Sequence, residues 1–221
     1  MHVHAKLVAL TQPLAITATT PEEFVAYAAR VSNPSNQNSN NTASNLLAYC
    51  VRNRHWSVFE MVNAVIEVEA PRDITRQLLR HRSFSFQEFS QRYSDEVQFT
   101  KRDFRRQDTK NRQNSTDDLP QTINGRAKYL RDRVAAMARE AYREMRSMDV
   151  AKECARVVLP EGLTLSRLYV NGTLRSWLHY LDVRDDPGVT QWEHVVLARE
   201  IRAVLEPVFP AVFGVLEPEH V

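Results

Sequence analysis

The scarcity of glycine limits the folds and sites that are open to this chain. Its 221 residues include five glycines, and no two of them lie within six residues of each other. Loops that cradle a phosphate or expose a nucleophile need closely spaced glycines, because other residues block the sharp turns and the close approach of the backbone. The sequence therefore excludes a GxGxxG dinucleotide motif, a Walker A loop and a GxSxG nucleophile elbow.

The basic residues are almost all arginine. Of 29 lysines and arginines, five are lysine, which leaves 24 arginines. The planar guanidinium group binds phosphate and carboxylate groups through paired hydrogen bonds that lysine cannot offer. With 43% hydrophobic and 25% charged residues, the composition is that of a single globular domain over residues 1–221. A net charge of only +2 argues against a protein that coats nucleic acid.

Other classes of site and location are disfavoured. Cys50 and Cys154 are too far apart in sequence for a CxxC motif, and we expect both to be small buried side chains in a reducing compartment. His2 and His4 share one side of an expected strand without an acidic third ligand, so we expect no metal site. There is no signal-peptide pattern and no apolar run long enough to span a membrane. A cytoplasmic location is expected, in a bacterium or, if the source is viral, in its host cell.

Hydrophobic periodicity predicts that helix outweighs strand. Alternating apolar residues predict strands from Val3 to about Ala9 and over Met61–Glu69, and a third strand is expected over Leu165–Asn171. The fold class is α/β or α+β, with helices packed on a modest mixed sheet. Capping signals and a period near 3.6 predict helices over residues 21–31, 46–51, 123–148, 150–159, 174–183 and 190–208, and a further helix from Arg72 through Leu78 to about Arg80.

One segment concentrates the polar chemistry. Residues 80–93 read RHRSFSFQEFSQRY, and three phenylalanines alternate with polar side chains in a half-buried extended stretch. Between Arg72 and Arg112, nine arginines and two lysines stand against six acidic residues, a surplus of five positive charges. The segment could be a solvated basic face, a site for a phosphate-bearing ligand, or a single-strand nucleic-acid site with bases stacked on aromatic rings. Residues 99–116, polar and basic, are expected to form a long excursion.

The spacing in this segment resembles a family signature. Arg80-His81-Arg82, seven residues and then Ser90 match the RHR-x7-S motif of the flavin-dependent thymidylate synthases (ThyX), and the longer pattern RHRxxSxxExSxRY is also satisfied. Residues 55–60, 155–160 and 171–184 are similar to further segments of that family in the same order. With Gln191 and Glu193 included, the resemblance covers roughly residues 21–205.

The resemblance implies a ThyX-like fold that assembles as a homotetramer, with active sites where subunits meet and FAD held without a Rossmann motif. The implied reaction is the reductive methylation of dUMP to dTMP. Its co-substrates would be 5,10-methylenetetrahydrofolate as methylene donor and NADPH as reductant through the flavin. A metal, a nucleic-acid partner and a membrane are not implied.

The matching motifs supply the candidates for the flavin site. Arginine side chains can fork onto a pyrophosphate, and a donor near the N1 and O2 edge of the flavin stabilises its anionic reduced form. Arg175 and His179 are four residues apart and share a helical face. The residues that the resemblance assigns to FAD are Ser57, Arg80, His81, Arg82, Thr173, Leu174, Arg175 and His179.

The nucleotide site is assigned in the same way. Ser90 has no evident general base in the sequence, so we interpret it as a phosphate or ribose ligand rather than a nucleophile. Glu88 would bind a sugar hydroxyl or orient an arginine. The residues that the resemblance assigns to dUMP are Gln77, Leu78, Leu79, Arg80, Glu88, Phe89, Ser90, Gln91, Arg92, Arg156 and Arg184.

Arg184 is the candidate catalytic residue. Uracil C5 is a poor nucleophile, and a guanidinium against the O2, N3 and O4 edge favours the N3-ionised form, which enriches C5 in electrons. Taken alone, Arg184 could also be a basic partner of a helix C-terminus. After it the chain has Asp185-Asp186-Pro187-Gly188, whereas some family members carry a histidine there.

Three functions are therefore compared. The leading hypothesis is an active thymidylate synthase; the others are a flavin- or nucleotide-binding homologue without turnover and a single-strand nucleic-acid binder. The basic stretch Lys101–Arg112 falls in a region that varies within the family. It could cover the glutamate tail of the folate or simply be solvated.

Overall fold

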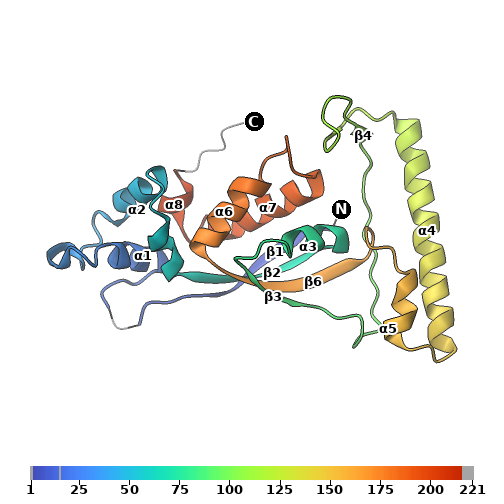
Figure 1. Cartoon of the computed structure of the whole chain (residues 1–221), viewed down its shortest axis with the longest axis horizontal. Coiled ribbons are helices and arrows are strands. Elements are labelled where there is room, and N and C mark those ends of the chain that lie inside the picture. The colour runs from blue at the N-terminus through green and yellow to red at the C-terminus, as the bar shows by residue number, and fades with distance from the viewer. Residues whose placement is uncertain (1, 15, 216–221) are drawn as a thin grey trace.

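The computed structural model describes residues 2–14 and 16–215, and its centre is a four-stranded sheet (Figure 1). Every neighbouring pair of strands is antiparallel, so the expectation of a mixed sheet is wrong. The second and third strands of this sheet along the chain do run in the same direction, but the fourth lies between them and is antiparallel to both, so no neighbouring pair is parallel. The order is β1 (His4–Leu10), β2 (Asn63–Pro71), β6 (Leu165–Thr173) and β3 (Ser85–Glu88).

Both central strands alternate buried and exposed residues, as the sequence predicted for β2. In β2 and the residue before it, Val62, Ala64, Ile66 and Val68 are buried, and Pro71 is the last residue of the strand. In β6 the buried set alternates in the same way with exposed polar residues such as Arg167. One face of the sheet therefore belongs to the core and the other is largely polar.

The edge strand β1 departs from the simple alternation. Ala5 is buried opposite Val68, but the register shifts between Leu7 and Ala9, as in a β-bulge. The extra residue leaves Ala9 exposed and turns Leu10 toward the core, so the alternation expected to about Ala9 is interrupted after Leu7.

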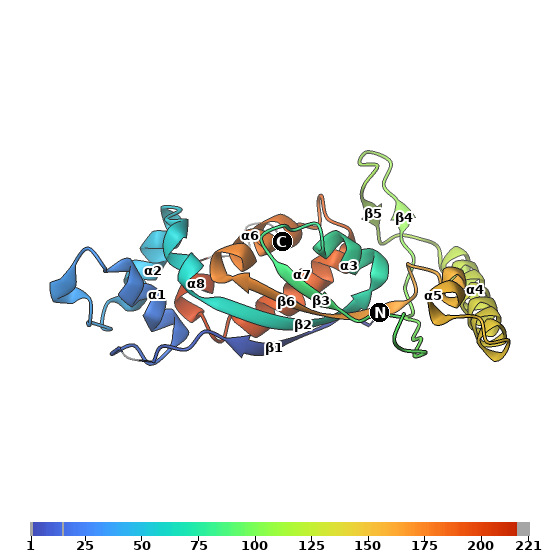
Figure 2. The same cartoon turned by 60° about the horizontal axis from the view of Figure 1, so that its bottom comes forward.

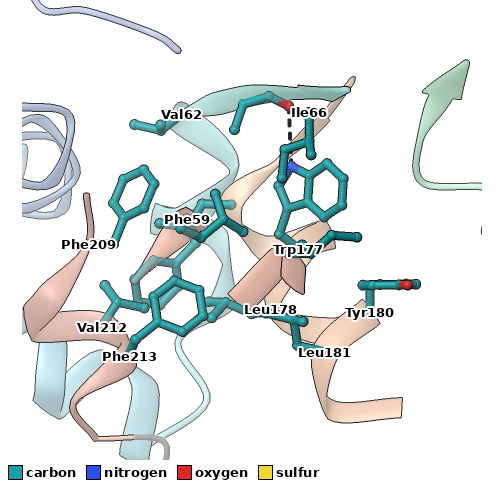
Figure 3. Close-up of a cluster of buried hydrophobic side chains, with 14 of the residues drawn as sticks. Phe59, Val62, Ile66, Trp177, Leu178, Tyr180, Leu181, Phe209, Val212 and Phe213 are labelled. Atoms are coloured by element: carbon teal, nitrogen blue, oxygen red, sulfur yellow. Dashed lines mark hydrogen bonds between the residues drawn. The ribbon is translucent and has the colours of Figure 1, made fainter. Parts of the chain in front are cut away.

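Helices cover the apolar face of the sheet. Figure 2 shows α3 (Arg72–Leu78), α6 (Leu174–Arg184) and α7 (Trp192–Leu205) on the same side of the strands. The side chain of Thr173 caps the first turn of α6 by accepting from the backbone N–H of Ser176 at 3.2 Å. The indole of Trp177 is fully buried and donates to the carbonyl oxygen of Ala64 in β2 at 3.2 Å (Figure 3).

Beyond β2 the core continues into a helical end of the molecule. This end contains α1 (Pro21–Ala29), η1 (Pro34–Asn36), α2 (Ala43–Arg52), η2 (Trp56–Met61) and α8 (Pro210–Phe213). The predicted cap of α1 is confirmed, because Thr20 and Glu23 exchange a capping box with Pro21 at the first position. Phe59, Phe209 and Phe213 meet in the core near Trp177 (Figure 3).

The opposite end is built from a long helix and an arm. The helix is α4 (Gln121–Ser147), which packs through Ala138 and Tyr142 and lies beside α5 (Lys152–Ala155) and η3 (Arg156–Val158). The arm, residues 99–116, carries the short hairpin β4 (Arg106–Gln107) and β5 (Ser115–Thr116) (Figure 2). Arg102 binds Asp73 through two hydrogen bonds of 2.7 and 2.6 Å, so ion pairs attach the arm to the sheet domain.

Several sequence expectations need correction at this level. The helix predicted over 150–159 consists of two short pieces, α5 and η3, and α8 was not predicted. Cys50 is buried as expected, but Cys154 is exposed on α5. Among the described residues no group of three or more His, Cys, Asp or Glu side chains could hold a metal, and no helix is long and apolar enough to cross a membrane.

Candidate active site

The RHR segment lies in a tight connection between α3 and β3. Two backbone turns follow the end of the helix. The backbone N–H of Arg80 donates to the carbonyl of Gln77, and that of His81 donates to the carbonyl of Leu78. Phe84 is buried and packs on Trp177 with ring centroids 4.3 Å apart. A Cβ at Gly172 would lie only 2.3 Å from the Phe84 ring, so this packing requires glycine there. The segment is thereby fixed to the core at both ends.

His81 and Arg184 come together from opposite sides of the site. Arg184, the last residue of α6, donates its Nε–H to Nε2 of His81 at 2.9 Å, although the two residues are 103 apart in sequence. Because Nε2 accepts, the neutral imidazole carries its proton on Nδ1. Burial, followed by the charge of Arg184, lowers the pKa of His81 to about 4. The predicted catalytic arginine and a predicted flavin residue thus share one hydrogen bond.

A second histidine, which the sequence did not indicate, extends this arrangement. His194 of α7 is fully buried, and its Nε2 lies 3.0 Å from the hydroxyl of Tyr180 in α6. Its Nδ1 lies 3.2 Å from Oε1 of Gln77, a predicted nucleotide ligand. Burial, then the charge of Arg184, lowers the pKa of His194 to about 3, and burial raises the pKa of Tyr180. We call His81, Arg184, Tyr180, His194 and Gln77 the central cluster.

The central cluster continues to the arm through amide and carboxylate groups. Gln77 Nε2 donates to Gln191 Oε1 at 2.8 Å, and Gln191 Nε2 donates to Glu193 Oε2 at 2.9 Å. The other carboxylate oxygen of Glu193 accepts from Arg105 at 2.8 Å. Arg105 and Glu193 also line a cavity of about 600 Å³ beside Trp192, outside the predicted site residues.

The remaining predicted flavin residues lie in η2, in the RHR segment and along α6. Ser57 in η2 is exposed, and Arg82 and His179 are exposed as well. Arg175 donates to Glu60 at 2.6 Å, and this hydrogen bond lowers the pKa of the glutamate. Leu174 is buried in the core, so only its backbone could contact a cofactor.

The other predicted nucleotide residues form a separate set, which we call the outer set. Arg92 lies 3.3 Å from a carboxylate oxygen of Glu153 in α5, and Arg156 donates to the backbone carbonyl of the same residue. Ser90 accepts from the Arg92 backbone N–H at 3.3 Å, and none of the hydrogen bonds among the described residues joins it to a histidine or carboxylate. The outer set consists of Glu88, Phe89, Ser90, Gln91, Arg92 and Arg156.

Glu88 links the outer set to the sheet. It accepts from Ser166 at 2.8 Å and lies 3.4 Å from Arg72 and 3.6 Å from Arg76. Gln91 is buried, and Leu78 belongs to the core, so a nucleotide could contact Leu78 only through its backbone. Leu79 is partly buried against the core.

One chain does not bring all of the predicted residues to one place. The outer set lies by α5, at the start of β6, whereas Ser57 and Arg175 lie at the end of that strand (Figure 1). A strand of nine residues spans roughly 27 Å at about 3.3 Å per residue. That length exceeds the size of a mononucleotide, so Ser57 and Arg175 are too far from Arg92 and Arg156 of the same chain to contact one mononucleotide together.

A family model described as thymidylate synthase complementing protein matches residues 14–211. The probable flavin-dependent thymidylate synthase of Paramecium bursaria Chlorella virus 1 is 43% identical over 214 residues, 96% of this chain and 98% of the relative. The enzyme of Synechocystis is 43% identical over 215 residues with the same coverage. The chain belongs to the flavin-dependent thymidylate synthase family.

Solved structures agree with this placement. The UMP/dUMP methylase PolB from Streptomyces cacaoi bound with 5-Br UMP superposes with a TM-score of 0.79 at 26% identity, over 97% of this chain and 93% of that one. The same protein bound with 5-Br dUMP gives a TM-score of 0.78 at 24% identity, over 97% and 94%. The second likeness shows the fold.

Proposed function

We propose that the protein converts dUMP to dTMP, with FAD as its flavin, 5,10-methylenetetrahydrofolate as methylene donor and NADPH as reductant. The observation that carries this proposal is the hydrogen bond between Arg184 and His81. It places the candidate catalytic guanidinium beside a residue of the flavin motif, although α6 and the RHR segment are far apart in sequence. Membership of the family supports the same reaction.

The donor groups at the proposed flavin site fit an anionic cofactor. With Nε2 of His81 engaged by Arg184, its Nδ1–H is the donor left for a ligand. Arg80 and Arg82 are exposed on either side of it, and Arg175 is already oriented by Glu60. FAD would supply the hydride that reduces the transferred methylene group to a methyl group.

Arg184 would act on the uracil ring. Its Nε is taken by His81, so the terminal nitrogens of the guanidinium are the groups that can face the carbonyl edge of the base. A fixed positive charge at that edge stabilises the negative charge that the ring carries when C5 acts as the nucleophile. Because both neighbouring imidazoles are neutral, they do not oppose this effect with a charge of their own.

The outer set would hold the phosphate and sugar. Ser90, Arg92 and Arg156 offer one hydroxyl and two guanidinium groups, the donor types that bind a phosphate dianion. Arg72, Arg76 and Ser166 hold the carboxylate of Glu88 in place, where it can accept from a sugar hydroxyl.

The separation of these residues supports a shared active site. If the outer set of one chain serves the central cluster of another, a complete site needs at least two copies, as in the homotetramer implied by the resemblance. Helix α4 has the surface for such an assembly, because Ile123, Leu130, Val134 and Met137 are exposed at heptad spacing on one face.

Two measurements test the proposed function. The purified protein is expected to be yellow, or to bind added FAD, and to release tritium from C5-labelled dUMP when methylenetetrahydrofolate and NADPH are present. A protein that binds FAD and dUMP but releases no tritium would be a binding homologue without turnover. A colourless protein that takes up no FAD but binds oligonucleotides with a steep salt dependence would instead be a nucleic-acid binder.

A further inference from the structure

A second cavity, of about 360 Å³, lies on the C-terminal half of α4, beside the segment that follows the outer set. Half of the side chains that line it are arginines, and these are spaced at i, i+4 and i+7, so they share one face of the helix. None of its lining residues is assigned to FAD or dUMP. They are Asp95, Val97, Arg139, Tyr142, Arg143 and Arg146.

Positive charge exceeds negative charge at this cavity. Asp95 is the one carboxylate among the described residues that line it, and it accepts from Arg146 at 2.7 Å and lies 3.1 Å from Lys152 Nζ. In the described part of the chain no carboxylate forms an ion pair with Arg139 or Arg143. With Lys152 included, four cations face one anion, a surplus of three positive charges. The cavity therefore suits an anion with more than one negative charge.

The cavity adjoins the proposed nucleotide site. Asp95 follows Arg92 of the outer set by three residues, and Lys152 donates to the backbone carbonyl of Tyr93 at 3.3 Å. Lys152 is also next in sequence to Glu153, which lies 3.3 Å from Arg92, at the end of the molecule where α5 lies beside α4 (Figure 1). A ligand that extends from the nucleotide site past residue 93 would therefore meet these arginines.

The arginines point away from the side of α4 that is proposed for assembly. Val134 belongs to the exposed apolar side, and Arg143 lies nine residues further on. Nine residues are about two and a half turns of an α-helix, so the two side chains lie on opposite sides. An assembly through the apolar side would therefore not cover the cavity.

The spacing of the arginines favours separate charges over a pyrophosphate. At a rise of about 1.5 Å per residue, Arg139 and Arg143 start about 6 Å apart along the helix. Glutamates joined through their γ-carboxyl groups carry one free carboxylate for every five backbone bonds, about 6 Å when extended. The two phosphates of a pyrophosphate share one oxygen and lie closer together. The guanidinium of Arg139 is held over the ring of Phe99, 5.1 Å from its centre, which restrains its position.

We propose that Arg139, Arg143 and Arg146 form a binding site for a chain of γ-linked glutamates on the folate co-substrate. This inference rests on the proposed function, which supplies the folate. Each guanidinium can pair with one carboxylate of the chain, and Arg146 would share its donors between Asp95 and the ligand. The site assigns the glutamate tail to α4 rather than to the basic stretch Lys101–Arg112 of the arm.

Steady-state kinetics with two forms of the co-substrate test this site. We expect the FAD-loaded wild type to have a KM about tenfold lower for 5,10-methylenetetrahydrofolate with five glutamates than for the form with one. The double variant Arg139→Gln/Arg143→Gln should bring this ratio close to one. The matched control Lys110→Gln/Arg112→Gln removes two exposed charges from the arm and should keep the ratio of wild type. Unchanged FAD content and thermal stability show that both variants are folded.

Two kinetic results would overturn the inference. One is a wild-type ratio near one. The other is a ratio that falls in the arm variant and persists in the α4 variant, because the tail would then lie on the arm. A wild type that forms no dTMP from either folate would overturn the proposed function, whereas one that forms dTMP with equal KM values would overturn the inference alone.

A titration without turnover identifies the kind of anion. FAD-loaded protein saturated with dUMP, which fills the outer set, is titrated with γ-linked tetraglutamate and separately with inorganic pyrophosphate. We expect wild type to bind the tetraglutamate and Arg139→Gln/Arg143→Gln to lose at least about tenfold in affinity for it. Binding of pyrophosphate without binding of tetraglutamate would show a phosphate site and contradict the proposal.

Discussion

The central cluster and the outer set both contain arginine, yet their surroundings differ. In the central cluster the groups are buried or half-buried, the histidines are neutral, and the side chains hydrogen-bond to one another. In the outer set Arg92 and Arg156 are exposed and gather about one exposed glutamate. Charges in water attract a ligand from several directions, whereas a buried network accepts only one arrangement. We therefore expect the first region to control chemistry and the second to control affinity.

The largest expected effect comes from Arg184→Ala. We expect FAD binding to be retained and dTMP formation to fall about a thousandfold, because the preorganised charge at the uracil edge is lost. Tritium release from labelled dUMP measures the rate, and Arg199→Ala, which removes a charge from the neighbouring helix α7, is the control. Substantial turnover in Arg184→Ala would refute the assigned role.

The packing beneath the central cluster can be broken by one methyl group. Gly172→Ala would place a Cβ 2.3 Å from the Phe84 ring, so we expect a loss of about 1–3 kcal/mol in unfolding free energy and weaker FAD binding. Gly125→Ala in α4 is the matched control, since nothing lies within 4 Å of its Cβ and alanine favours a helix by up to about 1 kcal/mol. Chemical denaturation of both variants checks the pair, and equal effects would contradict the argument.

Changes in the outer set are expected to act on binding. Arg92→Ala should weaken dUMP about tenfold with a smaller change in kcat, and the loss should shrink as salt is added. Ser90→Ala should weaken dUMP binding by less and leave measurable turnover, because we interpret its hydroxyl as a ligand of the nucleotide rather than a nucleophile. Isothermal titration and steady-state kinetics distinguish the two parameters. An inactive Ser90→Ala with intact dUMP affinity would revive the nucleophile interpretation.

The smallest effect concerns pH. A histidine with a lowered pKa in the folded state binds its proton more readily when unfolded, so its contribution to stability is lost as pH falls from about 6.5 toward 4. For buried His194 we expect a loss of about 1 kcal/mol between pH 7 and 5.5. Chemical denaturation at several pH values should show that His194→Asn lacks this loss of unfolding free energy. The control His4→Asn, at an exposed position on β1, should show the same loss as wild type. Identical pH profiles of stability in wild type, His194→Asn and His4→Asn would contradict a contribution from His194.

Local sequence patterns predicted much of the fold. The long periodic stretch predicted α4, the capping box predicted the start of α1, and the alternation of β2 gave the buried face. Strand direction was not predictable, because it depends on how the chain turns after α3. Hairpin strands of two residues, such as β4, carry no periodic signal.

The candidate site was predicted in part. The motif located Arg80–Arg82 and the later arginines, but it did not show that Arg184 would bind His81 or that the outer set would lie apart. Tyr180 and His194 were missed, because a histidine within the apolar run of α7 looks like any buried residue. Only the packing of α6 on α7 brings the two side chains together.

The end of α6 has a further consequence for the protein between turnovers. Asp185, the carboxylate next in sequence to Arg184, is held by Arg199 and Arg202 at 2.8 and 3.2 Å, and no carboxylate in the described part of the chain forms an ion pair with Arg184. A half-buried guanidinium without a counter-charge is an unfavourable state. A negatively charged molecule that binds beside Arg184 would supply the missing counter-charge. We therefore expect the free enzyme to be less stable than the occupied enzyme, and bound substrate to protect the protein against heat and proteolysis.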